Sequence, residues 1–200
     1  WYSGAGVYRD VFLWEGGEVR VEPWDTFITT PDEHTVRVKY ELSADRSADA
    51  AVTAAVRDHE GNTVATVMGA ADVIKGEKTP LTLTLRLDNP HLWDLDDPYL
   101  YRLHTEISVG GEVTDTADHT FGVRLISYTA EKGFQLNGKT VKMRGGCIHH
   151  DHGALGARAF PAAEERKVRL LKELGFNALR SSHYPPSLAL LEACDRLGMI

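Results

Sequence analysis

The spacing of apolar residues changes near residue 124, and this change constrains the fold more than any other feature. Before it, apolar and polar residues alternate, as at Val36, Val38, Tyr40 and Leu42. After it, apolar residues recur every three or four positions, as at Val168, Leu171 and Leu174. Alternation predicts half-buried strands, and the longer period predicts amphipathic helices. The chain is therefore expected to join a β region to an α/β region.

The β region is divided by turn-forming residues, among them Gly110-Gly111 and Asp88-Asn-Pro90. The predicted strands are residues 35–42, 50–57, 63–68, 81–87, 99–108 and 112–122. Six or seven short strands in about 100 residues are typical of an immunoglobulin-like sandwich. We assign this sandwich to residues 23–124, which makes the chain mainly β.

Residues 125–200 predict strand, helix, strand, helix. The strands are residues 140–148 and 177–181, and the helices are residues 162–174 and the segment after Pro185-Pro186-Ser187 that ends at Gly198. Two βα units make no closed α/β domain, so we expect this repeat to be truncated. A complete (β/α)8 barrel takes about 250 residues, more than the 200 in this chain.

The opening segment contains a run of apolar residues, Val11 to Trp14, after a tight turn at residues 3–6. It predicts a strand that has no partner nearby in the sequence. We therefore interpret residues 1–22 as the terminal strand of a preceding β domain, and the chain as cut at both ends.

Composition excludes several classes of protein. The chain has 22 Lys and Arg against 29 Asp and Glu, a net charge of −7, and its basic residues form no cluster, so no nucleic-acid partner is expected. No apolar stretch reaches the roughly 20 residues of a membrane span. Cys147 and Cys194 do not suggest a disulfide framework, which favours a reducing, cytoplasmic location, with export of the parent protein left open.

Histidines gather at the end of the first predicted barrel strand, where His149, His150, Asp151 and His152 follow one another. This is where a barrel displays functional groups, although a polar loop that happens to be rich in histidine is an alternative. A metal site is a third interpretation of these residues. If the strand alternation continued, His150 and His152 would point one way and the other two residues the opposite way, which gives pairs rather than four ligands.

A second candidate segment is Asn177-Ala-Leu-Arg-Ser-Ser-His-Tyr-Pro185, which also leaves a predicted strand. Arg180 would need a carboxylate or water for its donors. The alternative is an arginine paired with a local acidic residue. His183 is either a site residue or an ordinary loop histidine.

These segments resemble glycoside hydrolase family 2, which includes β-galactosidases, β-glucuronidases and β-mannosidases. Residues 177–200 are similar to the family's first signature almost position by position. Three further stretches resemble the family and follow its order. Residues 4–11 resemble the end of its jelly-roll domain, and residues 89–103 resemble a motif of its Ig-like domain. Residues 121–124 and 134–139 resemble the segment that leads into its barrel.

The resemblance implies a parent enzyme that hydrolyses terminal β-galactosides with retention. In that parent, residues 1–22 would hold the terminal strand of a sugar-binding jelly-roll domain, residues 23–124 the Ig-like sandwich, and residues 125–200 the first two βα units of the catalytic (β/α)8 barrel. The histidine matching His150 would line the sugar subsite, with Asp151 as a supporting residue. His183 would contact the sugar, and Arg180 would keep the nucleophilic carboxylate ionised. Many members have Asn-Arg or Asn-Lys before His-Glu, whereas this chain has Cys147-Ile148-His149 before His150-Asp151, so the alignment leaves open a shift of one residue between His149 and His150.

Retaining hydrolysis needs two carboxyl groups about 5 to 5.5 Å apart, which in this family are glutamates on later barrel strands. Asp151 lies on the first strand, and Glu164 and Glu165 would begin a helix on the outside of the barrel. We therefore expect no catalytic residue in this chain and no activity from it. No metal or cofactor is expected here, while a divalent or monovalent cation in the parent stays open.

Other interpretations remain. The parent could be a β-glucuronidase. The chain could instead be a non-catalytic carbohydrate-binding sandwich, which would need an exposed aromatic platform from Trp14, Trp24 or Trp93, although Trp93 is expected in the core. Finally, two βα units leave apolar faces uncovered, so packing against the sandwich or self-association is expected.

Overall fold

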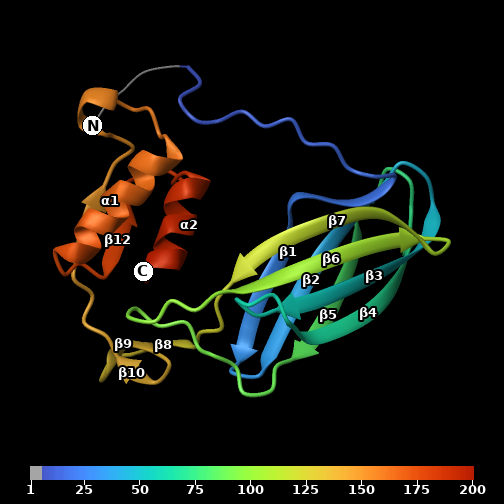
Figure 1. Cartoon of the computed structure of the whole chain (residues 1–200), viewed down its shortest axis with the longest axis horizontal. Helices are drawn as coiled ribbons and strands as arrows, with labels where there is room; N and C mark the ends of the chain where they lie inside the picture. The colour runs from blue at the N-terminus through green and yellow to red at the C-terminus, as the bar shows by residue number, and fades with distance from the viewer. Residues whose placement is uncertain (1–5) are drawn as a thin grey trace. The chain divides into compact units, whose positions relative to one another are not determined.

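The computed structural model describes residues 6–200 and forms two compact units (Figure 1). The sandwich unit comprises Trp14–Leu92 and Tyr99–Leu125. The barrel unit comprises Trp93–Pro98 and Ile126–Ile200 together with residues 6–13. The change of unit at Ile126 matches the change of period in the sequence.

The sandwich unit consists of two antiparallel sheets (Figure 1). One has the order β1-β2-β5 and the other β4-β3-β6-β7. The strands are β1 (Val19–Asp32), β2 (Thr35–Ala44), β3 (Ala48–Arg57), β4 (Thr63–Val73), β5 (Thr79–Arg86), β6 (Tyr101–Val109) and β7 (Glu112–Phe121). The predicted β-sandwich is confirmed.

The sandwich core follows from the alternating pattern. Val36 and Val38 of β2 and Val52, Ala54 and Val56 of β3 are completely buried, while the residues that alternate with them are more exposed. Tyr40 carries a hydroxyl into this core, and its oxygen lies 2.9 Å from Oγ1 of Thr105 on the other sheet. Burial raises the pKa of Tyr40 to about 12, so the hydroxyl stays protonated and hydrogen-bonded.

The barrel unit contains the predicted βα repeat. Parallel strands β11 (Gly145–Ile148) and β12 (Ala178–Ser181) are joined through α1 (Pro161–Glu173) and followed by α2 (Leu188–Leu197). Before them come a small sheet of β8 (Ile126–Thr129), β9 (Gly133–Leu136) and β10 (Lys139–Thr140), and after β11 a short helical turn, η1 (Gly153–Leu155). The helices pack through Val168, Leu190 and Ala193.

Local chemistry sets the ends of both helices. Pro161 occupies the first turn of α1, where its missing N–H costs nothing. The hydroxyl of Ser187 accepts from the N–H of Leu190 and caps α2, and Gly198 ends that helix with a φ of 70°. A Cβ at Gly198 would also lie 2.0 Å from the carbonyl oxygen of Leu95, so glycine is required there for two reasons.

One predicted strand is divided. Residues 140–148 were expected to be continuous, but β10 ends at Thr140 and β11 begins at Gly145. The side chain of Asn177 forms hydrogen bonds with the main chain between these two strands. Its amide oxygen accepts from the N–H of Arg144 at 2.6 Å, and its amide nitrogen donates to the carbonyl of Lys142 at 3.1 Å.

The strand expected from Val11 to Trp14 is not formed, so that prediction is wrong. No strand of residues 6–200 pairs with this segment, and an unpaired strand leaves its backbone groups to water. Phe12 and Leu13 are 81% and 92% exposed. Val19 to Glu22 belong to the sandwich instead, because they lie in β1, which pairs with β2. The assignment of the residues before them to a preceding domain stays a prediction, and residues 1–5, with most of the predicted turn at 3–6, lie outside the described residues.

Trp93 is buried, as expected. Its indole nitrogen donates to the carbonyl of Asp195 at 2.7 Å, and its own carbonyl accepts from Asn137 at 3.0 Å. Lys172 similarly donates to the carbonyl of Leu95. These bonds hold Trp93–Pro98 within the barrel unit. No helix in residues 6–200 has the length and apolar character needed to span a membrane.

Candidate functional site

The two candidate segments leave neighbouring strands at the same edge. Strands β11 and β12 are parallel, with Cys147 opposite Arg180 and Ile148 opposite Ser181. Parallel neighbours end on the same side of a sheet, so residues 149–152 and 182–185 emerge together. The structure thereby brings together segments that the sequence separates by a helix.

His150 lies between two tyrosines. Its ring stacks on Tyr8 with centroids 4.9 Å apart, and it meets Tyr184 edge-on at 4.4 Å. Its main-chain N–H donates to the hydroxyl of Tyr184 at 3.2 Å, and Nδ1 of His149 lies 3.3 Å from the same oxygen. The hydroxyl of Tyr184 therefore ties both histidines to the segment after β12.

The environment of His150 favours its neutral form. Burial, and then the positive charge of Arg9, lower the pKa of His150. Its Nδ1 atom is buried and has no hydrogen-bond partner among the described residues. A neutral imidazole with an unsatisfied nitrogen can exchange a hydrogen bond with a ligand hydroxyl.

Arg9 fastens the N-terminal segment to this edge. Its guanidinium donates to the carbonyls of Pro185 at 2.7 Å and Pro186 at 3.3 Å, which brings Tyr8 onto His150. Sequence reasoning did not select Tyr8, Arg9 or Tyr184 as site residues. The available signal was that Tyr8 and Arg9 fall in the stretch 4–11 that resembles the family, and Tyr184 in the signature segment.

Arg180 lies on the open face of the two-stranded sheet. Its Nη1 donates to Oγ of Ser182 at 3.1 Å and to Sγ of Cys147 at 3.3 Å. Hydrogen bonding from Ser182 and from Arg180 lowers the pKa of the Cys147 thiol. The alternative of a local salt bridge is wrong, because within residues 6–200 no carboxylate pairs with Arg180, and its remaining donors can meet a carboxylate from elsewhere.

Asp151 and His183 stand apart from these contacts. Asp151 is half-buried at a cavity of about 580 Å³ that it lines with His152 and Lys167. His183 is exposed and follows a cis peptide bond after Ser182. Among the described residues, no hydrogen bond joins either side chain to His150 or Arg180.

The expected alternation along residues 149–152 is wrong, because β11 ends at Ile148 and the three histidines lie in the loop that follows it. The side chain of His152 turns into the unit, where Nε2 lies 3.5 Å from Oε1 of Glu164. Within residues 6–200, no three His, Cys, Asp or Glu side chains lie where they could hold a metal ion.

Glu164 begins α1 as expected, but its side chain is not on an outer surface, since the residue is only 2% exposed. The hydroxyl of Ser187, at the start of α2, donates to its Oε1 at 3.0 Å, and Lys167 lies 3.4 Å from Oε2. Glu164 therefore joins α1, α2 and the histidine loop. Glu165 is more exposed and forms an ion pair with Arg196 at 2.9 Å.

A sandwich followed by parallel βα units, with polar side chains at the strand ends, is the arrangement expected at the start of a barrel that follows an accessory β domain. The family can be named more closely. The model of glycosyl hydrolases family 2 matches residues 19–124, and the TIM barrel domain model of that family matches residues 128–200. The chain belongs to glycosyl hydrolases family 2.

Similar proteins support the same assignment. Beta-galactosidase BoGH2A of Bacteroides ovatus is 38% identical over 206 residues, which cover 100% of this chain and 24% of that protein. A crystal structure of a family 2 member from Bacteroides cellulosilyticus superimposes with a TM-score of 0.95 at 44% identity, covering 100% of this chain and 27% of that one. The crystal structure of a β-glucuronidase of Bacteroides uniformis superimposes with a TM-score of 0.79 at 31% identity, covering 88% of this chain and 22% of that one. The chain spans about a quarter of the length of these relatives.

Proposed function

We propose that this chain is part of a retaining glycoside hydrolase that acts on terminal β-galactosides. The observation that carries the proposal is the 38% identity to a β-galactosidase along the whole chain. The position of His150 and Arg180 at the carboxyl ends of adjacent strands supports it, because barrel enzymes bind their substrates there.

The site residues take supporting roles in this proposal. Arg180, with donors that meet no carboxylate in residues 6–200, would lie beside the nucleophilic carboxylate and keep its pKa low. Neutral His150 would exchange a hydrogen bond with a sugar hydroxyl through Nδ1. Exposed His183 would contact the sugar, and Asp151 would support the histidine loop.

The chain on its own is proposed to be inactive. The chemistry needs two carboxyl groups about 5 to 5.5 Å apart across the substrate. Glu164 is buried against Ser187 and Glu165 pairs with Arg196, so neither is free for this role. The purified 200-residue chain should not hydrolyse a nitrophenyl β-galactoside when host enzyme is excluded, and measurable turnover would overturn this part of the proposal.

The second candidate is a β-glucuronidase, which the similarity to the Bacteroides uniformis enzyme favours. The test is made on a protein of the relatives' length that contains this chain. We expect kcat/KM for a nitrophenyl β-galactoside to exceed that for the β-glucuronide by at least tenfold. The reverse ratio would favour the second candidate, and activity on neither would overturn both.

A non-catalytic sandwich that binds carbohydrate is the third candidate. Trp24 favours it, since this residue is 80% exposed and lies where the pairing of β1 shifts between Val21 and Thr26. Quenching of tryptophan fluorescence by galactose, lost in Trp24→Phe, would support it. The first two candidates predict no quenching from the sandwich.

We propose no cofactor for this chain, and a divalent or monovalent cation only for the complete enzyme. We also propose that the protein is located in the reducing cytoplasm, which is consistent with its two free cysteines.

The isolated chain is further proposed to self-associate through apolar side chains of the barrel unit. Leu174 and Leu188, for example, are 75% and 48% exposed. Sedimentation should show a mass that rises with concentration. A constant monomer mass would contradict self-association.

A further inference from the structure

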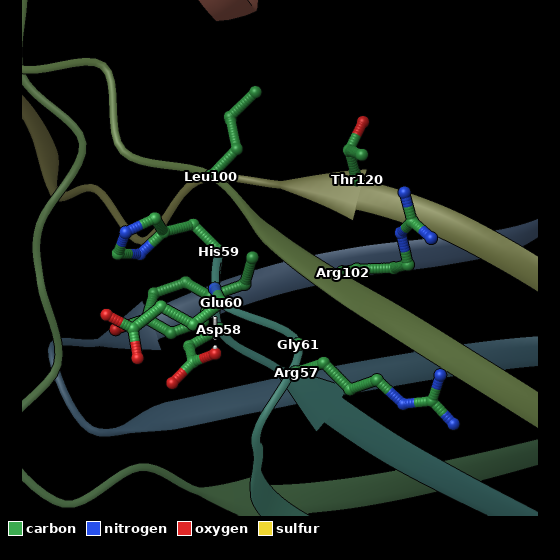
Figure 2. Close-up of a pocket in the computed structure, with 9 residues that line it drawn as sticks. Arg57, Asp58, His59, Glu60, Gly61, Leu100, Arg102 and Thr120 are labelled. Carbon is green, nitrogen blue, oxygen red and sulfur yellow. Dashed lines mark hydrogen bonds between the residues drawn. The ribbon is translucent and has the colours of Figure 1, made fainter.

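The sandwich unit contains a cavity of about 290 Å³ at one end of its four-stranded sheet (Figure 2). Its lining includes Arg57, Arg102 and Thr120 from three strands and His59 and Leu100 from the adjoining loops. The volume is near the lower end of the roughly 300 to 1,000 Å³ found for small-molecule sites. The proposed hydrolytic function makes no use of this cavity.

Two arginines are paired directly across this sheet. Arg57 of β3 is the register partner of Arg102 of β6, so both side chains leave the same face. Like charges placed directly opposite each other destabilise a sheet, and a guanidinium cannot relieve the repulsion by losing its proton. A bound anion would reverse the sign of this interaction.

A threonine continues the row on one side. Thr120 of β7 pairs with Arg102 and lines the same cavity. On the other side the pairing of β3 with β4 shifts between Val56 and Arg57, so the row ends at Arg57. The outward row is therefore Arg57, Arg102, Thr120, and all three side chains can donate hydrogen bonds.

Two carboxylates, those of Asp58 and Glu60, also line this cavity, but among the described residues they form no ion pair with the two arginines. Asp58 is held in its own turn, where it accepts from the N–H groups of Asn62 at 2.8 Å and Glu60 at 3.0 Å. Figure 2 shows the carboxylates of Asp58 and Glu60 on one side and the guanidinium groups of Arg57 and Arg102 on the other. In the part of the chain that the structure describes, neither arginine has an ion pair with a carboxylate.

Acidic groups further along the same face are also engaged. Asp118 and Glu106 lie 3.1 and 3.3 Å from the two ring nitrogens of His104. On the loop side of the cavity, Nδ1 of His59 lies 2.9 Å from the hydroxyl of Tyr99. The imidazole of His59 and the side chain of Leu100 also line the cavity, and they offer a flat ring and an apolar group to a ligand that carries a charged group.

We infer that the sandwich unit carries a second, non-catalytic binding site for an oxyanion, in which Arg57 and Arg102 hold a carboxylate or sulfate group and Thr120 lies beside them. The group is carried by an acidic sugar or is a free small anion. Arginine suits both, because its planar donors match carboxylate and tetrahedral oxyanions in a bidentate way.

The site can be tested on the 200-residue chain by titration with glucuronate, inorganic sulfate and galactose, followed through backbone amide shifts. We expect saturable shifts at Arg57, Arg102 and Thr120 with the two anions and none with galactose. Arg57→Gln and Arg102→Gln should each weaken binding at least about tenfold. Arg37→Gln, an exposed arginine on β2 of the other sheet, is the matched control and should leave affinity unchanged.

Thermal unfolding provides an independent measurement. Without anion, Arg102→Gln should keep or slightly raise the melting temperature, since it removes like-charge repulsion. With anion, the wild-type chain should gain stability and the variant should not.

The relative affinities for glucuronate, sulfate and galactose decide between the possible ligands. Tighter binding of glucuronate than of sulfate assigns the site to an acidic sugar, and equal binding assigns it to a free anion. Equal shifts with galactose, or equal weakening by Arg37→Gln, would overturn the inference, as would absence of saturation. Because the readout is binding by the sandwich, failure here leaves the proposed hydrolase function untouched.

Discussion

The sandwich unit and the barrel unit cover their apolar residues in different ways. In the sandwich, two sheets face each other, and each supplies the other with its apolar surface, from Val38 and Tyr40 on one side to Val52 and Leu103 on the other. In the barrel unit, two helices cover one face of a two-stranded sheet, and the face that carries Cys147 and Arg180 stays open. A pair of antiparallel sheets therefore completes its core with few strands, whereas parallel βα units need more of their kind.

The first prediction concerns the self-sufficient core. Leu103→Ala should lower the free energy of unfolding of the sandwich by about 2 to 5 kcal/mol, because the side chain is completely buried and its removal leaves a cavity. Denaturant unfolding followed by near-UV circular dichroism measures this. Leu174→Ala, at an exposed position of the barrel unit, is the control and should change stability by less than about 0.5 kcal/mol.

The second prediction concerns the buried polar contacts of Glu164, which join the two helices of the barrel unit. It tests whether this unit depends on polar contacts, whereas the sandwich depends on apolar packing. Glu164→Ala should cost about 1.5 to 3 kcal/mol, because it leaves Ser187 and Lys167 without their charged partner. Hydrogen exchange should accelerate in α1 and α2 and not in β2 or β6. Glu164→Gln keeps the shape and one acceptor and should cost less. Unchanged exchange in both helices would show that the junction contributes nothing.

The third prediction concerns the polar contact inside the sandwich. Tyr40→Phe removes the hydroxyl that contacts Thr105 at 2.9 Å, leaves the ring in place and should cost about 0.5 to 1.5 kcal/mol. Thr105→Val removes the other partner. The double variant should cost less than the sum of the two single ones, and strict additivity would mean that the two hydroxyls do not interact.

Sequence patterns predicted most of the sandwich because each strand carries its own alternation. They missed β1, whose alternation is interrupted at Pro23 and Trp24, where the pairing with β2 shifts and Trp24 has a φ of 76°. A bulge of this kind moves side chains to the other face. The pattern therefore fails where the backbone is irregular.

The candidate site was predicted in part. The positions of His150 and Arg180 at strand ends followed from the βα repeat, but the stacking of Tyr8 on His150 joins distant parts of the chain and leaves no local pattern. Glu164 looked like an ordinary acidic residue in a first helical turn. Its burial depends on Ser187 of another helix, and no periodicity within α1 could indicate that.

The smallest effect should come from the two cysteines, which lie in different surroundings within the barrel unit. Cys147 is exposed on the open face, and Ser182 and Arg180 lower its pKa. Cys194 packs against the helical core, and burial raises its pKa to about 12. Since the thiolate is the nucleophile, iodoacetamide should alkylate Cys147 well before Cys194 at neutral pH.

The pH dependence separates electrostatics from exposure. Arg180 stabilises the thiolate of Cys147, so its replacement in Arg180→Gln should raise the thiol pKa and move the pH midpoint of alkylation upward, with folding unchanged. Arg169→Gln, an exposed arginine of α1, is the matched control and should leave the midpoint in place. A midpoint that stays the same in Arg180→Gln would mean that exposure alone makes Cys147 reactive. An upward shift would show that the open face holds a cation able to stabilise a neighbouring negative charge, which is the role proposed for Arg180 beside a carboxylate.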